Sequence, residues 1–309
     1  NRLAADIGGT FTDLVLINES GELVVEKTPS TPGDFKQGVL SGVKKTIDGA
    51  NLVNTEKTLT LRDVEYFVHG ATVVLNALIE RKLPRTALIT TEGFRDVLEI
   101  MRTNNPFMYD MSYIKPAPLI KRRYRFEVRE RVLADGSVMT ALDEDSVRDA
   151  AHRLRDSGAE AVAICLLHSY ANGAHERRVR DIVRDICPDV TVCISCEVAG
   201  EVREFERSST TAINASTVPI ITSYLDDLSS DLDHMGLRRD LYVMQSNGGV
   251  ISAQVARDLP VRTVLSGPSG GVVGGAYLAE RMGLENVVTL DMGGTSTDIG
   301  LVVDGRAVT

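Results

Sequence analysis

DIGGTFTD (Asp6 to Asp13) returns near the other end of the chain as DMGGTSTD (Asp291 to Asp298). In each copy an aspartate ends a short apolar run, glycines and hydroxyl residues follow, and a second aspartate opens the next apolar run. This order predicts a strand, a tight turn and a second strand. One copy alone is also typical of an ordinary hairpin, but two matched copies favour a shared kind of ligand.

The chemistry of the two motifs predicts a phosphate-binding cradle. Adjacent glycines let backbone N–H groups approach an anion, and hydroxyl groups add donors. The predicted phosphate-binding residues are Gly8, Gly9, Thr10, Thr12, Gly293, Gly294, Thr295, Ser296 and Thr297. Carboxylates repel phosphate unless a divalent cation lies between them, so we expect Mg²⁺, held partly through water, at Asp6, Asp13, Asp291 and Asp298. The predicted ligand is a magnesium nucleotide.

Composition narrows the class of protein. The 309 residues are enough for two domains, or for one domain with a large insertion. With 43% hydrophobic and 25% charged residues, the chain has the composition of a globular protein. Its net charge of −9 opposes binding to nucleic acid or to an anionic membrane, so we expect a small-molecule partner instead. Apolar runs such as Ala161 to Leu167 fall far short of the ~20 residues that span a bilayer.

The cysteines and the two ends of the chain bear on its location and completeness. Four cysteines are too few for a disulfide scaffold, and no signal peptide is visible, which predicts a cytoplasmic protein. The chain opens on strand residues and stops just after a hairpin signal at Val303 to Gly305. We therefore expect it to be a piece of a longer protein.

Strands alternate with helices along the first part of the chain. Three short apolar runs separated by turns predict an antiparallel meander, and helical and strand patterns then follow in turn. This alternation predicts an α/β fold with a parallel or mixed sheet. The predicted elements are strands Leu3 to Ile7, Leu14 to Ile17 and Leu23 to Val25, a helix from Phe35, strand Val64 to Val68, helix Thr72 to Arg81 and strand Thr86 to Ile89.

The middle of the chain predicts a less regular segment and then a second α/β unit. Residues 95–142 hold several prolines and a hairpin signal at Ala134 to Ser137, which favours an inserted subdomain or a lid. Within it, the basic stretch Lys121 to Arg131 is compatible with nucleic-acid contact, but its alternation of aromatic and charged residues favours a strand with one wet face. The second unit comprises a helix that Asp143 or Asp145 caps and Gly158 ends, strand Ala161 to Leu167, helix 174–186 and strand Val190 to Ile194.

Two further features have alternative interpretations. Cys193 and Cys196, with Cys187 and two nearby histidines, are compatible with a zinc site, but a single CxxC pair in an apolar strand favours buried thiols. The segment from Ser266 to Gly275 holds many glycines, each costing a helix interior about 1 kcal/mol relative to alanine. We interpret it as a helix whose backbone packs closely against another element, the alternative being a loop.

Together these segments resemble the superfamily of sugar kinases, heat-shock chaperones and actin, in which two phosphate turns and a connecting helix form part of a two-domain ATP clamp. The two aspartate motifs are similar to the phosphate turns, and Pro268 to Gly283 to the connecting helix. Within the superfamily the chain resembles the hydantoinase A and 5-oxoprolinase family. The carriers are His69 to Lys82, Thr86 to Ile100, Leu166 to Ile182, Arg203 to Ala215, Ser246 to Val250 and Leu265 to Gly275.

The resemblance implies a fold and a domain organisation. It predicts an actin-like, ribonuclease H-like ATPase domain over residues 1–285 that contains an inserted α/β region at about 95–235. Residues 286–309 then begin a second actin-like domain. Two positions depart from the family pattern, since Ala71 stands where threonine is common and Cys196 where serine or histidine is common.

The resemblance also implies an activity. Family members use ATP and Mg²⁺ to phosphorylate the oxygen of a cyclic amide, such as a hydantoin or 5-oxoproline, before water opens the ring. They work with a hydantoinase B-like subunit or fused domain, so we expect a hetero-oligomer. The alternatives are a subunit of an ATP-dependent ketone carboxylase and a non-metabolic actin-like ATPase switch.

For catalysis we select His69, Asp6 and Asp291. His69 is expected between a strand and a helix, where it is a candidate acid or base, or a histidine satisfied by local hydrogen bonds. The candidate substrate-binding residues are Thr72, Asn76, Arg95 and Asn247.

Overall fold

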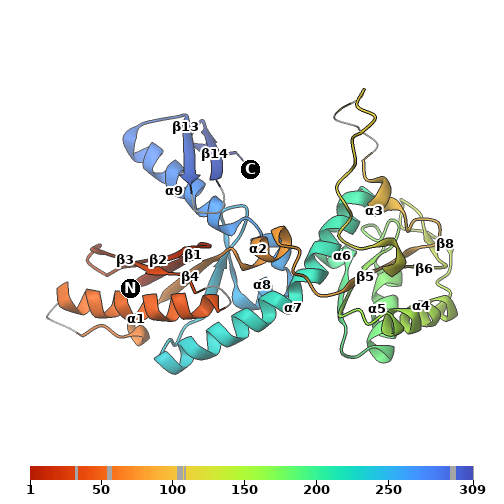
Figure 1. Ribbon diagram of the computed structural model, residues 1–309, viewed down its shortest axis with the longest axis horizontal. Helices are drawn as coiled ribbons and strands as arrows, with labels where there is room; N and C mark the ends of the chain where they lie inside the picture. The colour runs from red at the N-terminus through yellow and green to blue at the C-terminus, as the bar shows by residue number, and fades with distance from the viewer. Residues whose placement is uncertain (32–33, 54–57, 103–106, 108, 293–296, 309) are drawn as a thin grey trace. The chain divides into compact units, whose positions relative to one another are not determined.

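The computed structural model describes residues 1–31, 34–53, 58–102, 107, 109–292 and 297–308 (Figure 1). The chain divides into two compact units, which we describe separately. The first unit combines Asn1–Arg81 with Ile220–Thr309, and the second unit is Lys82–Pro219. The domain limits expected above, with an insertion at about 95–235 and a new domain from 286, stay predictions.

The first unit is built on a mixed sheet in the order β12-β11-β4-β1-β2-β3. Strands β1, β2 and β3 form the predicted antiparallel meander, whereas β4 pairs parallel with β1, and β11 pairs parallel with β4. Its elements are β1 (Arg2–Ile7), β2 (Phe11–Ile17), β3 (Leu23–Pro29), α1 (Phe35–Val53), β4 (Tyr66–Ala71), α2 (Val73–Ile79), β11 (Leu241–Met244), β12 (Val250–Ser252), α8 (Ala253–Asp258), α9 (Ser266–Met282), β13 (Val287–Met292), β14 (Thr297–Val303) and β15 (Arg306–Ala307).

One face of this sheet forms the core of the first unit. Side chains alternate along each strand, so Leu3, Ala5 and Ile7 of β1 point to the same buried face. Helix α1 packs on that face together with the last part of helix α7 (Glu204–Met235), as Figure 1 shows. The opposite face is open among the described residues, and Val25 there is 66% exposed.

Helix α9 confirms the interpretation of the glycine-rich segment. A methyl group added to Gly275 would lie 2.3 Å from Thr289 Cγ2 of β13, and one added to Gly270 would lie 3.3 Å from Met244 Sδ of β11. The helix thus contacts both the main sheet and the small β13-β14-β15 sheet through its backbone. Gly283 ends it in the left-handed conformation.

The second unit has a parallel sheet in the order β10-β9-β5-β6 and a separate β7-β8 hairpin. Its elements are β5 (Thr86–Thr91), α3 (Val97–Ile100), β6 (Arg125–Val128), β7 (Arg131–Val132), β8 (Val138–Thr140), α4 (Glu144–Asp156), β9 (Ala161–Cys165), α5 (Ala174–Ile186), β10 (Thr191–Ile194), α6 (Ser195–Val198) and the first part of α7. Every residue of β5 and β9 is buried, because helices cover both faces of the sheet. The helix after Asp143 and the helix 174–186 are confirmed.

The structure corrects two sequence-based expectations. Strand β4 continues through Ala71, which pairs with Ile7, so His69 lies inside a strand and not between a strand and a helix. The stretch 121–131 has no wet face at Arg125, because that side chain is buried and bonded to Ile120 O and Glu99. Helix α7 is an element that the sequence analysis did not predict. Its two parts pack on different cores, and Pro219 lies in its middle.

Among the described residues, no helix has the length and apolar character needed to cross a membrane. Three of the four cysteines are buried and Cys196 is half-buried, in keeping with buried thiols. Burial raises the pKa of Cys196 to about 12.

The adjacent glycines of α9 provide a matched test of its packing. Gly275→Ala places a methyl group against Thr289, whereas no described atom lies within 4 Å of the Cβ position at Gly274. Alanine favours a helix by about 1 kcal/mol over glycine, and overpacking costs roughly 1–3 kcal/mol. Denaturant unfolding should show that Gly274→Ala is stabilising and Gly275→Ala destabilising. Equal effects of the two changes would contradict the close packing of α9.

Candidate phosphate-binding site

The two aspartate motifs form hairpins with the same register. Asp6 pairs with Asp13 across β1 and β2, and Asp291 pairs with Asp298 across β13 and β14. Directly opposed residues in an antiparallel pair project to the same face, so each hairpin presents two carboxylates beside its turn. The predicted strand, turn and strand are therefore confirmed for the strands of both copies.

The first turn is open to solvent. The Gly8 N–H donates to Phe11 O (2.8 Å), and Gly9 and Thr10 are exposed. A methyl group at Gly8 would lie 3.1 Å from Phe11 O, so the tight turn favours glycine there. The corresponding residues of the second turn, Gly293 to Ser296, lie outside the described residues.

Asp6 is exposed at the carboxyl ends of parallel strands, and backbone approaches its carboxylate from β4 and α9. It pairs with Gly70 of β4, where a methyl group would lie 2.5 Å from Asp6 Oδ1. A methyl group at Gly267, in the first turn of α9, would lie 3.6 Å from the same oxygen. Gly70 thus makes room for the Asp6 carboxylate beside β4, whereas Gly267 at the N-terminus of α9 lies at ordinary van der Waals distance from it.

Hydroxyl groups fix the elements around this carboxylate. Ser266 Oγ donates to Ala71 O (3.1 Å) and accepts from Ala71 N–H (3.3 Å), which holds the start of α9 on the end of β4. Thr72 Oγ1 donates to Ile7 O (2.8 Å), which ties the start of α2 to the end of β1. Asn76 Nδ2 contacts Thr72 Oγ1 at 3.4 Å. Gly70, Ser266 and Gly267 were not predicted as site residues, although the SGP segment preceding the glycines was the available signal.

The Asp6 carboxylate experiences the negative charges of two other aspartates. Burial raises the pKa of Asp6, and the negative charges of Asp13 and Asp291 raise it further. Asp13 is already paired with Lys27, whose Nζ lies 2.8 Å from Asp13 Oδ1. Because Asp291 influences Asp6, the two motifs share one electrostatic environment, and a cation there would relieve the repulsion. Within the described ranges, no group of three or more His, Cys, Asp or Glu side chains is arranged to hold a metal ion directly.

Several predicted residues lie elsewhere. Thr12 is fully buried on the face opposite Asp13, and its Oγ1 shares a hydrogen bond with Ser30 Oγ (3.1 Å). Adjacent residues of a strand face opposite sides, which separates its hydroxyl from the carboxylates. Asn247 Oδ1 accepts from Gly249 N–H (2.9 Å) in the exposed β11–β12 turn. Arg95 belongs to the second unit, where Nη1 lies 3.7 Å from Glu127 Oε2.

His69 is fully buried inside β4. Its Nδ1 lies 3.2 Å from Ala5 O and its Nε2 lies 2.8 Å from the Tyr224 hydroxyl. Burial lowers the pKa of His69 to about 4. Both ring nitrogens therefore have protein partners, and the imidazole is neutral at physiological pH.

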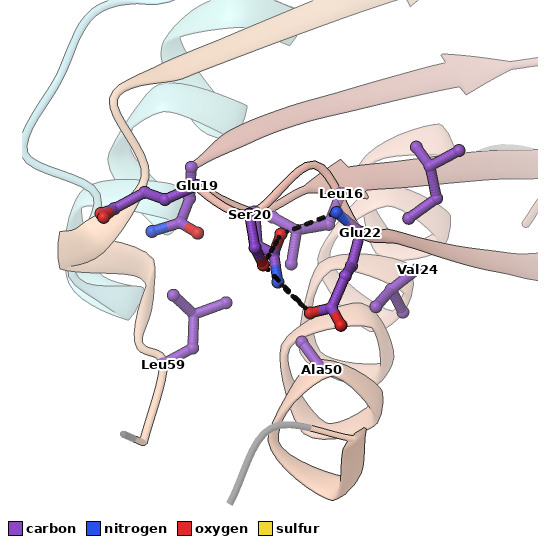
Figure 2. A pocket seen from close by; sticks show the side chains of 10 residues that line it. Leu16, Glu19, Ser20, Glu22, Val24, Ala50 and Leu59 are labelled. Atoms are coloured by element: carbon purple, nitrogen blue, oxygen red, sulfur yellow. Dashed lines mark hydrogen bonds between the residues drawn. The ribbon is translucent and has the colours of Figure 1, made fainter. Parts of the chain in front are cut away.

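Figure 2 shows a cavity of about 240 Å³ between the β2–β3 turn and α1. Its polar groups bond to one another, since Asn18 Nδ2 donates to Glu22 Oε2 (2.6 Å) and Ser20 Oγ donates to Asn18 Oδ1 (2.8 Å). The turn adjoins Ile17, which pairs with Arg2 at the end of β1 remote from Asp6. This cavity is therefore separate from the aspartate site.

Comparison with known proteins agrees with this geometry. Residues 2–187 match the hydantoinase/oxoprolinase N-terminal region, and residues 207–309 match the hydantoinase/oxoprolinase domain. The chain belongs to the hydantoinase/oxoprolinase family. The caprolactamase alpha subunit of Pseudomonas jessenii is 36% identical over 99% of this chain and 44% of its own length.

Two solved structures of related proteins superpose closely on this chain. Nucleotide-free acetone carboxylase superposes with a TM-score of 0.89 at 32% identity, covering 99% of this chain and 44% of the other. ATP-dependent caprolactamase from Pseudomonas jessenii superposes with a TM-score of 0.85 at 35% identity, covering 97% and 43%. The predicted actin-like ATPase fold is confirmed, and the chain spans less than half the length of these relatives.

The raised pKa of Asp6 predicts a pH-dependent stability difference. The folded protein disfavours ionised Asp6, so this group stabilises the fold below its ordinary pKa of 3.8, and that contribution is lost as the pH rises through the raised value. Without divalent cations at neutral pH, Asp6→Asn should be more stable than the wild-type chain. The difference in unfolding free energy between Asp6→Asn and the wild-type chain should shrink as the pH falls towards 3.8. Denaturant titrations across this range, with Asp304→Asn as the control, would refute the assignment if the gap stayed constant.

Proposed function

We propose that this chain is the nucleotide-binding part of an ATP-dependent enzyme that phosphorylates a cyclic amide to activate it for ring opening. The observation that carries the proposal is the pair of hairpins with equivalent aspartate pairs, Asp6 with Asp13 and Asp291 with Asp298. The influence of Asp291 on Asp6 supports one shared site. Ligands of α/β sheets bind at the carboxyl ends of parallel strands, where Asp6 lies.

The donors of this site fit a magnesium nucleotide. Mg²⁺ prefers oxygen ligands and keeps several waters, so one or two carboxylates suffice without a cage of three. Asp6 and Asp291 are the proposed holders, while Asp13 and Asp298 support them from the facing strands. When bound, Mg²⁺ neutralises the charge of the phosphates. The exposed Gly9 and Thr10 and the second-turn residues Gly293 to Ser296 are the proposed phosphate contacts.

The proposed reaction has three steps. The γ-phosphoryl group of ATP passes to the carbonyl oxygen of the lactam, and ADP leaves. One water then adds to the activated carbon, and the ring C–N bond breaks with proton transfer to nitrogen, which leaves an acyl phosphate. A second water hydrolyses the acyl phosphate to a carboxylate and free phosphate. An amide carbonyl is a poor electrophile, and phosphorylation of its oxygen creates a good leaving group. Thr72, which lies with Asp6 near Gly267, and Asn76, which contacts Thr72, are the proposed substrate contacts. Arg95 and Asn247 are weaker candidates for substrate binding.

A ketone carboxylase subunit is the second candidate, because the chain superposes closely on acetone carboxylase. There the phosphoryl group would pass to an enol and to bicarbonate, not to a lactam. An ATP hydrolysis assay of the full-length protein with hydantoins, 5-oxoproline and caprolactam, and separately with ketones plus bicarbonate, distinguishes the two. Stimulation only by a ketone with bicarbonate would replace the lactam proposal.

The aspartates give a direct test of the phosphate site. Asp6→Ala and Asp291→Ala should each lower ATP turnover by about a hundredfold or more, since each removes charge stabilisation at the reacting phosphates. Asp304→Ala, in the β14–β15 turn, is the matched control and should turn over ATP normally. Near-normal turnover by both site variants would refute the phosphate-site assignment.

We also propose that the complete protein works with a partner subunit or fused domain. The named relative is itself a subunit, and this chain spans 44% of its length. In the second unit, Tyr109, Met111 and Ile114 are 94%, 98% and 87% exposed, respectively, which is unusual for large apolar side chains. Their segment is anchored by Lys115 Nζ, which donates to Ile100 O (2.6 Å). These residues lie within 95–142, the segment expected to be an inserted subdomain or a lid, and they are the proposed contact with a hydantoinase B-like partner.

The same residues allow a test of whether partner binding couples ATP hydrolysis to product formation. Replacing Tyr109, Met111 and Ile114 together by serine should weaken partner binding by at least about tenfold, since burying each side chain contributes roughly 1.5–3 kcal/mol. ATP hydrolysis should continue while product formation falls. The control variant replaces Leu23 and Val25 of β3 by serine, since these apolar side chains are also exposed, at 62% and 66%, but lie outside residues 95–142. Unchanged coupling in the triple variant would exclude this docking surface.

A further inference from the structure

His69 has fixed donor and acceptor roles. Ala5 O can only accept, so Nδ1 of the neutral imidazole carries the proton and donates to it. Nε2 must then accept, and the Tyr224 hydroxyl donates to it at 2.8 Å. Burial raises the pKa of Tyr224, and the charge of Asp34 raises it further, so the hydroxyl keeps its proton. The two rings are stacked with centroids 5.7 Å apart.

The hydrogen bonds that run from Tyr224 through His69 end at Ala5 O, one residue before Asp6 of the phosphate site. Ala5 precedes Asp6 in β1, and His69 precedes Gly70 in β4, the two pairs being in register. Because a methyl group at Gly70 would lie 2.5 Å from Asp6 Oδ1, the carboxylate has little free space towards β4. A small shift of β1 against β4 would therefore displace Asp6. Tyr224 lies in α7, so the hydrogen bond to His69 connects α7 to β4 at this point.

We propose that His69 and Tyr224 are positioning residues for Asp6, and that the hydrogen-bonded chain from Tyr224 through His69 to Ala5 O holds the end of β1 in the geometry for binding Mg²⁺. This inference rests on the proposed function, in which Asp6 helps to hold the metal. It assigns His69 no proton transfer with substrate, because both ring nitrogens are engaged inside the core. Residues that orient metal ligands typically contribute 10–100-fold to metal affinity or activity.

The test uses the full-length protein with its partner and measures two quantities against Mg²⁺ concentration, the ATP turnover and, without ATP, the rise in thermal unfolding temperature that bound Mg²⁺ produces. Tyr224→Phe removes only the hydroxyl that donates to His69, and it should raise the half-saturating Mg²⁺ concentration by about tenfold. His69→Asn keeps an amide donor for Ala5 O, and it should retain more activity than His69→Ala. The matched control is Tyr242→Phe, since Tyr242 packs beside Tyr66 on the opposite face of the same sheet.

A double variant and a pH profile separate positioning from acid–base chemistry. Tyr224→Phe combined with His69→Asn should cost little more than the larger single effect, because both changes break one chain. The pH profile of turnover should keep its shape in both variants. Loss of one limb of the profile in His69→Asn would overturn the proposal, and so would unchanged Mg²⁺ dependence in Tyr224→Phe.

The Asp6→Ala variant separates failure of this inference from failure of the proposed function. If Asp6→Ala abolishes turnover but Tyr224→Phe matches the Tyr242→Phe control, only the positioning role is refuted. If Asp6→Ala turns over ATP normally, the phosphate site itself is refuted, and the positioning role falls with it.

Discussion

The parallel pairing of β1 with β4 is the constraint on which the rest of the first unit depends. It places Asp6 opposite Gly70 and Ala5 opposite His69, so that one register determines both the exposed carboxylate and the buried histidine. Slippage by one residue would turn Asp6 into the core and the apolar residues out to solvent. The alternation of Leu3, Ala5 and Ile7 on the buried face opposes that slip.

Close approach, not chain flexibility, explains the glycine at position 70. Gly70 leaves room for the Asp6 carboxylate beside β4. Ser266 then joins α9 to β4 through both polar groups of Ala71.

Helix α7 has a different role in each unit. Its first part packs under the parallel sheet through small residues such as Ala212 and Ala215, and Arg207 donates from it to Ser169 Oγ (2.8 Å). Its last part packs on the first sheet through Leu225 and carries Tyr224 to His69. The buried polar groups around Arg207 and Glu176 largely satisfy one another, which rigidifies the carboxyl edge of the second sheet.

The sequence by itself determined the duplicated aspartate hairpins, the α/β class, the helix that joins the two motifs and the family, because these follow from local patterns of glycine, charge and hydrophobic period. Only the tertiary structure decided which residues share the site. Strand β4 extends through Ala71 because β1 pairs with it, and this long-range pairing buries His69. Thr12 faces away from the carboxylates because Ser30 and α1 lie on its side of β2. Such outcomes depend on contacts between segments far apart in the chain, which local spacing does not encode.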